Sequence, residues 1–563
     1  MEKKSVYDLR PVKLPHVTGG LLKLLDNLVR NPITRPLVLP NLIASAGFKR
    51  LDDLITADPP TLMPYHPFET SAKNPAPVSL DKVPKLPRRK SGFAYRSIRD
   101  YAEAYRKGAI TPTEVAERAL AAIEASDKGD KPVRAFIAVY REDVLKQAEA
   151  STKRFKAKKP LGQFDGVPVA VKDEIDMLPY PTTIGTKAFA NHFPTRDATI
   201  VARLRTAGAT LLGKANMAEY GLATTGLNVP FGTARNPHNL DHHTGGSSSG
   251  PAAAVAAGFC PVALGADGGG SIRMPSAHCG LVGLMSTKGR VSGFGAAPVD
   301  RSVGHLGPLA ATAEDAALTY AVIAGVDPLD FDTVYQPPVT LDGLGNASLA
   351  GVTLGVYPEW FNDADPEVLS AADAMREHLK RLGAKIKEIE IPQLDVMYLA
   401  HALTIVSELA ASMHALPKSA YDDLSPEIRI QFALANSLPA SLYVQAQRMR
   451  TRALAIFDEL FQSVDAIITP TVAIPAPAIN PAALESGESN LSQVITTLRF
   501  VAQANLCGLP AISFPMGFAA SGAPMGFQAI GKPWSEALLL RMAYLADGLA
   551  EHRQPKVYWD LLA

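Results

Sequence analysis

Three short glycine-containing segments hold the side chains of this sequence that are best suited to nucleophilic chemistry. GVPVAVKDEID (166–176) ends an apolar run on a lysine, and TGGSSSGPAAAVAAG (244–258) has three serines after two glycines. GADGGGSIRMPSAHCGLVG (265–283) has one serine after three glycines. A serine hydroxyl becomes a strong nucleophile only when a base accepts its proton, so a serine and a base must meet in space.

Taken alone, each of these residues has an ordinary structural explanation. A lysine that ends a buried strand usually forms an ion pair or extends its charged end to water. Serines after glycines usually belong to turns or cap helices. The argument for a site is therefore the combination, in which Ser247 and Ser271 lie 24 residues apart with a helix-like and a strand-like stretch between them.

Two other motifs imitate known sites. GATLLGKA (208–215) fits the G-x-x-x-x-G-K of a phosphate-binding loop, but it lacks the following Ser or Thr, and its inner residues form an apolar strand. Gly208 is better explained as the residue that ends the preceding helix. GSSSG (246–250) fits a nucleophile elbow centred on Ser248, but the preceding NLDHHT is polar and turn-like, whereas the elbow needs a buried strand.

The histidines and cysteines do not suggest a metal or a thiol nucleophile. His242 and His243 are adjacent, so their side chains diverge, and we expect them to be exposed loop residues. Cys279 is expected to be a small buried apolar residue rather than a nucleophile. We predict no metal and no cofactor.

Taken together, the three segments resemble the lysine strand, the Gly-Gly-Ser-Ser segment and the nucleophile segment of the amidase signature family. The resemblance extends from about Ser97 to the C-terminus, and it departs at Gly268, where threonine is common, and at Met285 and Ser286, where Lys-Pro is common. Further pieces follow in the family's order, namely LLGKANMAEYG (211–221), ARNPHN (234–239), GRVS (289–292), ITPT (468–471) and NLCGLPAISFPMG (505–517).

The resemblance implies a catalytic triad of Ser271, Ser247 and Lys172 that hydrolyses a carboxylic amide, or a related carbamate or ester, through an acyl-enzyme. Ser271 would attack, and Ser247 would relay its proton to Lys172. A free lysine has a pKa of about 10.4, but burial can lower the pKa of a lysine by roughly 3–5 units, so that the amine can act as a base. An ammonia-generating component of an amidotransferase complex is the alternative, although such proteins usually lack a long N-terminal extension.

The nucleophile segment also implies supporting roles. The backbone N–H groups of Gly268, Gly269, Gly270 and Ser271 would form an oxyanion hole, because glycines let the backbone turn its N–H groups toward one point. Ser248 and Ser249 would satisfy N–H groups at the start of the next helix, and Asp267 with Arg273 would brace the segment as an ion pair. Pocket walls are expected within 395–450 and 471–500, where no residue type identifies the substrate.

The elements that must position these residues follow an α/β pattern. TPTEVAERALAAIEA (111–125) predicts a helix with Thr111 as N-cap, Pro112 at N1 and Glu114 at N3. The alternation of strands with helix-like stretches such as 197–206 and 366–382 predicts an α/β fold with a buried sheet. The resemblance implies a large mixed β-sheet covered by helices on both faces. The predicted strands are VPVAV (167–171), ATLLG (209–213), PVALGA (261–266), TLGVY (353–357) and AIIT (466–469).

Residues 1–90 form a proline-rich extension with short helices, which we separate from a catalytic domain at 91–563. Its leucines could pack on the main domain, on a partner protomer or on a membrane face, and we expect a homodimer. These leucines are Leu21, Leu22, Leu24, Leu25 and Leu28.

Composition excludes several classes of protein. The 563 residues are 47% hydrophobic and 20% charged with a formal net charge of +1, so no attraction to nucleic acid is expected. The longest apolar run, 251–266, is broken by glycine and proline and is too short to span a bilayer. No secretory signal precedes the first elements, and three scattered cysteines suggest a reduced, cytoplasmic chain.

Overall fold

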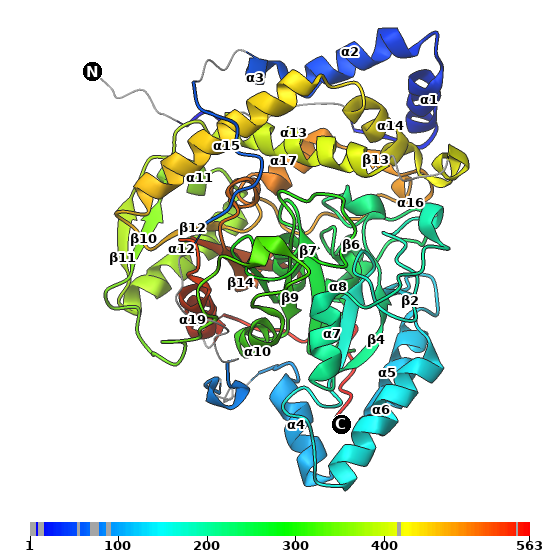
Figure 1. Cartoon of the computed structure of the whole chain (residues 1–563), viewed down its shortest axis with the longest axis vertical. Helices are drawn as coiled ribbons and strands as arrows, with labels where there is room; N and C mark the ends of the chain where they lie inside the picture. The colour runs from blue at the N-terminus through cyan, green and yellow to red at the C-terminus, as the bar shows by residue number, and fades with distance from the viewer. Residues whose placement is uncertain are drawn as a thin grey trace.

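A mixed β-sheet of eleven strands lies at the centre of the computed structural model (Figure 1). The structure describes residues 7–9, 16–52, 57–67, 78–85, 92–413, 418–547 and 550–563. The strand order is β11-β10-β12-β15-β14-β8-β9-β7-β3-β4-β2. The strands are β2 (Phe136–Ala138), β3 (Pro168–Lys172), β4 (Thr210–Ala215), β7 (Val262–Asp267), β8 (Val282–Met285), β9 (His305–Ala310), β10 (Thr353–Val356), β11 (Lys385–Glu388), β12 (Ala466–Pro470), β14 (Ala511–Phe518) and β15 (Pro524–Gly531).

Helices surround this sheet. The α-helices are α1 (Gly19–Arg30), α2 (Arg35–Ser45), α3 (Lys49–Asp52), α4 (Ile98–Lys107), α5 (Pro112–Ser126), α6 (Arg141–Lys156), α7 (Thr199–Thr206), α8 (Ser249–Ala256), α9 (Arg273–Cys279), α10 (Ala313–Ile323), α11 (Pro358–Phe361), α12 (Pro366–Arg381), α13 (Leu394–Ser412), α14 (Pro426–Ala435), α15 (Ala440–Leu460), α16 (Ala483–Ser486), α17 (Leu491–Leu498), α18 (Ala502–Cys507) and α19 (Glu536–Asp547). Helices α8 and α9 contact each other and the sheet, and α10, α12 and α19 form a second group on it. The predicted α/β fold with a large mixed sheet and flanking helices is confirmed.

Parallel pairing in the middle of the sheet positions the candidate site. Strand β3 pairs in parallel with β7 on one side and with β4 on the other. Because parallel strands run in the same direction, their carboxyl ends lie at the same edge of the sheet. Lys172 is the last residue of β3 and Asp267 is the last residue of β7. The lysine strand and the nucleophile segment therefore reach the same edge.

The sequence patterns correspond to observed elements. All five predicted strands lie in the central sheet, as β3, β4, β7, β10 and β12. At the start of α5, the Thr111 side chain accepts a hydrogen bond from the Glu114 backbone, and the Glu114 side chain accepts one from the Thr111 backbone. Its apolar residues Val115, Ala119 and Ile123 are buried. Both the cap and the inward face of this helix are thus confirmed.

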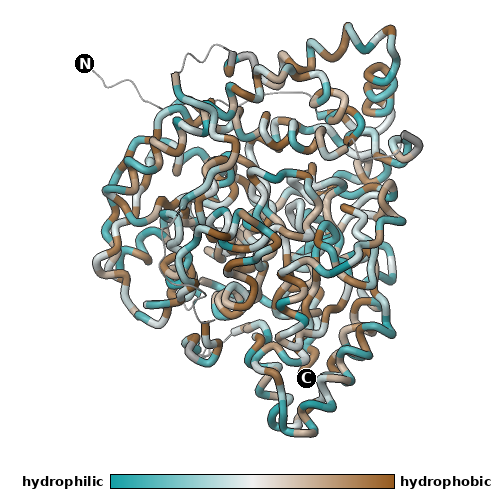
Figure 2. The backbone as a smooth tube through the Cα atoms, in the orientation of Figure 1, coloured by the Kyte–Doolittle hydropathy of each residue, from teal (hydrophilic) through white to brown (hydrophobic). Residues whose placement is uncertain are grey.

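The N-terminal extension packs on the catalytic domain. Strand β1 (Val17–Thr18) pairs with β13 (Glu488–Ser489), and α1 contacts α14 and α16. Leu22 is fully buried, and Asp26 forms a buried ion pair of 2.6 Å with Arg429 of α14. Of the three alternatives for the leucines, the structure thus places Leu22 on the main domain, while Leu21 and Leu24 are exposed. Figure 1 shows α1 and α2 lying along α13–α15. In Figure 2, hydrophobic and hydrophilic residues alternate along α1 and α2.

Removing this extension should expose apolar surface. Deletion of residues 1–52 would uncover the side of α14 that contacts α1 and α2, so solubility should fall or the light-scattering mass should rise. The homodimer expectation is tested by the same measurement on the full chain. Arg30→Ala is the matched control, because it removes only the exposed pair of Arg30 with Asp422. A truncated chain with unchanged solubility and mass would show that residues 1–52 of the extension are dispensable.

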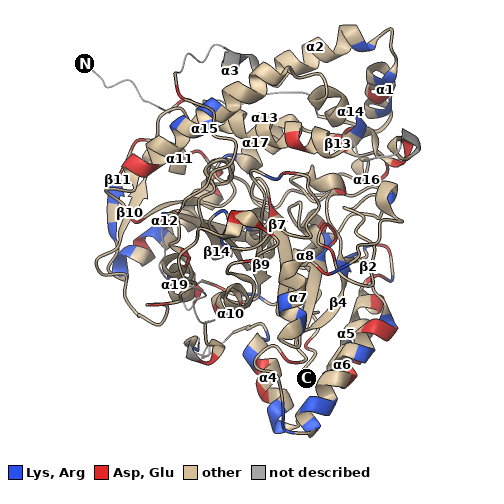
Figure 3. Ribbon diagram, viewed as in Figure 1, with Lys and Arg blue, Asp and Glu red and all other residues tan. Residues whose placement is uncertain are grey.

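Acidic and basic residues are interspersed on the outer helices in the view of Figure 3, without a large region of one sign. Among the described residues, one helix, α13, is long and apolar enough to cross a membrane by length and composition alone. In the most apolar stretch of α13, 56% is buried inside the protein. The helix packs on α15 and α18. This packing is that of a core helix.

Candidate active site

Lys172 and Ser247 meet at the carboxyl edge of the sheet. The Lys172 Nζ donates a hydrogen bond of 2.8 Å to the Ser247 Oγ and one of 3.3 Å to the Ala266 carbonyl. Both side chains are buried, at 1% and 3% exposure, so bulk water does not compete for this contact. For Lys172 to act as a base, the direction of the hydrogen bond must reverse, so that the Ser247 hydroxyl donates to a neutral amine.

Ser271 lies next to the serine segment and is more accessible than its neighbours. Its carbonyl accepts a hydrogen bond of 3.4 Å from the Ser248 N–H, which joins the nucleophile segment to the start of α8. The Ser271 residue is half-buried, and its hydroxyl makes no hydrogen bond within the part of the chain that the structure describes. Ser271 is thus more exposed than Ser247 and Lys172, which both stay buried.

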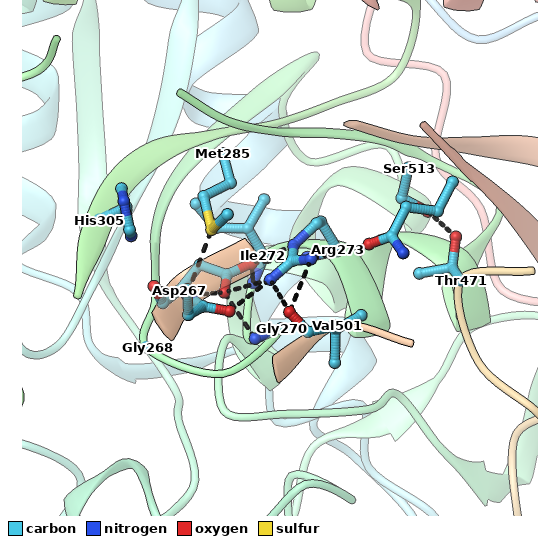
Figure 4. A network of polar contacts seen from close by, with 12 residues as sticks. Asp267, Gly268, Gly270, Ile272, Arg273, Met285, His305, Thr471, Val501 and Ser513 are labelled. Carbon is cyan, nitrogen blue, oxygen red and sulfur yellow. Dashed lines mark hydrogen bonds and ion pairs between the residues drawn. The ribbon is translucent and has the colours of Figure 1, made fainter. Parts of the chain in front are cut away.

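A buried polar network fixes the backbone around Ser271 (Figure 4). The Arg273 Nε donates to an Asp267 carboxylate oxygen at 3.0 Å, and both side chains are fully buried. Asp267 also accepts hydrogen bonds from the backbone N–H of Gly270 at 2.5 Å and of Ile272 at 3.1 Å, and from the Asn505 amide at 2.9 Å. The predicted ion pair is therefore present, and it holds the backbone on both sides of Ser271.

Opposing effects act on the ionisation of Asp267. Burial would raise the pKa of the carboxyl, but the charge of Arg273 and the hydrogen bonds from Arg273, Asn505 and Gly270 hold the pKa well below its usual value of 3.8. Asp267 is therefore a carboxylate at neutral pH, and a buried carboxylate with all these donors is a rigid anchor for the loop.

The oxyanion prediction needs one correction. The Gly270 N–H is already hydrogen-bonded to Asp267, so an oxyanion would have to share or replace that bond. The N–H groups of Gly268, Gly269 and Ser271 make no hydrogen bond to any described residue and are the available donors. The run of glycines in the sequence did not indicate this contact. The carboxylate of Asp267, three residues before Gly270, accepts a hydrogen bond from the Gly270 N–H.

The two serines at the start of α8, Ser248 and Ser249, also differ from the prediction. The Ser248 side chain makes no cap hydrogen bond, and its Oγ donates instead to the Ala266 carbonyl at 3.2 Å. The buried Ser249 Oγ has no partner among the described residues. The prediction that these hydroxyls satisfy the helix N–H groups was therefore wrong. Ser248 helps tie α8 to the end of β7.

The alternative motifs are also resolved. The segment before the elbow-like serines is not a turn but strand β6 (Asn239–His243), which pairs with β5 (Arg235–Asn236) outside the central sheet, and His242 also forms an antiparallel bridge with Ala478. His243 is buried, against the expectation of an exposed loop, and burial lowers its pKa to about 3.

Gly208 follows α7 with φ +90°, as predicted for a helix end. Burial raises the pKa of the Cys279 thiol well above its usual range, which does not favour a thiolate.

Two acidic residues near the lysine were not identified as site residues. Glu174, two residues after Lys172 in the quoted segment, places a carboxylate oxygen 3.3 Å from the lysine Nζ. It would stabilise the positive charge that Lys172 gains when a proton arrives. Asp300 lines a cavity of about 90 Å³ together with Glu174. Burial, with the nearby charges of Glu174 and Glu408, raises the pKa of Asp300 to about 7.

Ile405 and Leu498, which lie in the expected pocket stretches, and Val501, just beyond the second stretch, approach the nucleophile loop (268–271). A Cβ added at Gly268 would lie 3.2 Å from Ile405, one at Gly269 would lie 3.8 Å from Leu498, and one at Gly270 would lie 2.5 Å from Val501. Apolar side chains from α13, α17 and the start of α18 thus lie near the loop, although Asp300 and His401 come closer to Gly268 and Gly269. Among the described residues, no group of three or more His, Cys, Asp or Glu side chains could hold a metal ion.

Comparisons with known proteins identify the family of this chain. The family model described as Amidase matches residues 114–540. The chain is 39% identical to a fatty acid amide hydrolase of Arabidopsis thaliana, over 99% of this chain and 96% of that protein. It is 33% identical to a glutamyl-tRNA(Gln) amidotransferase component of Koribacter versatilis, over 78% of this chain and 95% of that component. The crystal structure of a peptide amidase with the competitive inhibitor chymostatin superposes with a TM-score of 0.71 at 28% identity, over 82% of this chain and 98% of the peptide amidase. The chain therefore belongs to the amidase signature family of amide-hydrolysing enzymes.

Proposed function

We propose that this chain hydrolyses amides with a long apolar acyl group, and related carbamates or esters, through a covalent intermediate on Ser271. The observation that carries the proposal is the buried hydrogen bond of 2.8 Å between Lys172 and Ser247, with the accessible Ser271 beside it. In this mechanism Ser271 attacks the carbonyl carbon while its proton passes through Ser247 to Lys172. The same relay returns a proton to the leaving amine, and water then hydrolyses the acyl-enzyme.

The acyl group is inferred from two observations. Three of the side chains that approach the loop, Ile405, Leu498 and Val501, are apolar and suit a hydrocarbon chain. In addition, the relative from Arabidopsis thaliana named fatty acid amide hydrolase matches 99% of this chain, including the extension. The match to the amidotransferase component leaves about a fifth of the chain uncovered, so the ammonia-generating alternative is less well supported.

A fluorophosphonate probe tests the nucleophile. Because Ser271 is the proposed attacking residue, mass spectrometry should find the adduct on Ser271, and the Ser271→Ala variant should remain unlabelled. Ser248→Ala is the matched control and should still be labelled, since its hydroxyl binds the Ala266 carbonyl. An adduct on Ser248 in the wild-type chain would contradict the proposal.

A substrate panel tests the acyl group and the alternative function. The purified chain alone should hydrolyse primary amides of fatty acids, and kcat/KM should rise as the acyl chain lengthens from two to about sixteen carbons, because each buried CH₂ contributes about 0.8 kcal/mol. Turnover that appears only after a partner protein is added would favour the amidotransferase alternative. Equal turnover of short and long chains would contradict the acyl assignment alone.

A further inference from the structure

A histidine far away in the sequence contacts the nucleophile loop. His401 of α13 lies with its Nε2 at 2.7 Å from the Gly268 carbonyl oxygen, and the imidazole is 1% exposed. A carbonyl can only accept a hydrogen bond, so the Nε2 must carry the hydrogen. The Nδ1 has no partner among the described residues. Burial lowers the pKa of His401 to about 4, so the ring is neutral at physiological pH and has its hydrogen on Nε2.

This hydrogen bond sets the direction of the neighbouring peptide group. The Gly268–Gly269 peptide bond is trans, and in a trans peptide the C=O and the N–H point in opposite directions. Fixing the Gly268 carbonyl toward α13 therefore turns the Gly269 N–H away from α13. That N–H makes no hydrogen bond to any described residue and lies two residues before Ser271.

The loop is packed so closely that a larger residue at Gly268 or Gly269 would displace a neighbouring side chain. A Cβ at Gly268 would lie 1.8 Å from an Asp300 carboxyl oxygen, and a Cβ at Gly269 would lie 2.8 Å from the His401 ring. Threonine is common at this position in the family. The glycine at 268 in this chain leaves room for the Asp300 carboxyl, which occupies the place a side chain would take. His401 and Asp300 together confine the Gly268–Gly269 peptide group.

We infer that His401 is a positioning residue of the oxyanion hole, which holds the Gly268 carbonyl and thereby presents the Gly269 N–H to the oxygen of the tetrahedral intermediate. This inference rests on the proposed function, since it needs an oxyanion formed by attack of Ser271. His401 itself touches neither the substrate nor the Ser271 hydroxyl. Its contribution is the orientation of a donor, which should affect the transition state more than substrate binding.

Two variants of similar shape test this role. His401→Gln keeps an N–H donor within reach of the Gly268 carbonyl, whereas His401→Met has a side chain of similar length without a donor. Loss of one oxyanion donor costs about 10²–10³ in kcat, and loss of its orientation should cost somewhat less. We expect kcat of His401→Met to fall roughly 10–10²-fold with KM nearly unchanged, and His401→Gln to recover most of this loss. His238→Gln, a change to a buried neutral histidine outside the site, is the matched control and should retain the wild-type kcat.

A pair of inhibitors separates positioning from general damage. A long-chain trifluoromethyl ketone forms a tetrahedral adduct with a serine, whereas the corresponding secondary alcohol cannot form one. His401→Met should weaken the ketone by about the same factor as kcat/KM and leave the alcohol unchanged. Equal weakening of both inhibitors, or a ketone affinity and kcat within twofold of wild type in folded His401→Met, would overturn the inference. If the wild-type chain neither hydrolyses amides nor reacts at Ser271, the proposed function fails instead.

Discussion

Replacing Lys172 with alanine should lower kcat for amide substrates by about 10³-fold or more, because the relay loses its base. Lys172→Arg should not rescue turnover, since a guanidinium stays protonated and cannot accept a proton. In the structure the Lys172 Nζ is 2.8 Å from the Ser247 Oγ and 3.3 Å from a Glu174 carboxylate oxygen. Steady-state kinetics on a fatty acyl amide measure the effect.

The control for Lys172 is the second buried lysine, Lys214, at the same edge of the sheet. Lys214 forms an ion pair of 3.4 Å with Asp173 and donates to the Asp173 and Pro181 carbonyls, which marks it as structural. Lys214→Met should lower thermal stability while a folded preparation keeps its kcat within a few-fold of wild type. Near-wild-type amide turnover by Lys172→Ala, or full activity of Lys172→Arg, would contradict the assignment of Lys172 as the base.

The sheet and the approach of its residues to one edge could be predicted because they depend on local patterns. Runs such as VPVAV and PVALGA are continuous and apolar, as expected for strands that are buried on both faces. The Thr111 cap was predictable because its partner is three residues away. Where both partners of an interaction lie within a few residues, as with Asp267 and Arg273, the sequence indicates the contact.

The remainder of the site depends on packing between distant segments. His401 is 133 residues from Gly268, and Asn505 is 238 residues from Asp267, so no local pattern relates them. Ser248 and Ser249 were assigned to helix capping from residue type alone, but Ser248 finds an acceptor in β7 that only the folded chain provides. The burial of His243 was missed for the same reason, since its strand β6 is short and mostly polar.

Asp267→Asn should give the largest loss of stability. The variant leaves the Arg273 guanidinium buried without a counter-charge, and breaking a buried ion pair by removing one partner costs about 3–5 kcal/mol in the free energy of unfolding. It should also slow the labelling of Ser271, because the Gly270 and Ile272 N–H groups lose a charged acceptor. Denaturant titration and the rate of fluorophosphonate labelling measure the two effects separately.

The Asp267→Asn prediction is made specific by the expected pH dependence of the stability loss and by a control variant in another buried ion pair. The pKa of Asp267 is lower in the folded chain than its ordinary value of 3.8, so its contribution to stability is present above pH 3.8 and is lost as the pH falls toward the folded value. The stability gap between wild type and Asp267→Asn should therefore be constant from about pH 5 to 8 and narrow below about pH 4.

Asp165→Asn is the control, because Asp165 is a buried partner of Arg154, away from the site. It should also destabilise the chain but leave the labelling rate of Ser271 unchanged. If both variants slow labelling equally, the Asp267 network has no particular role in holding the nucleophile loop.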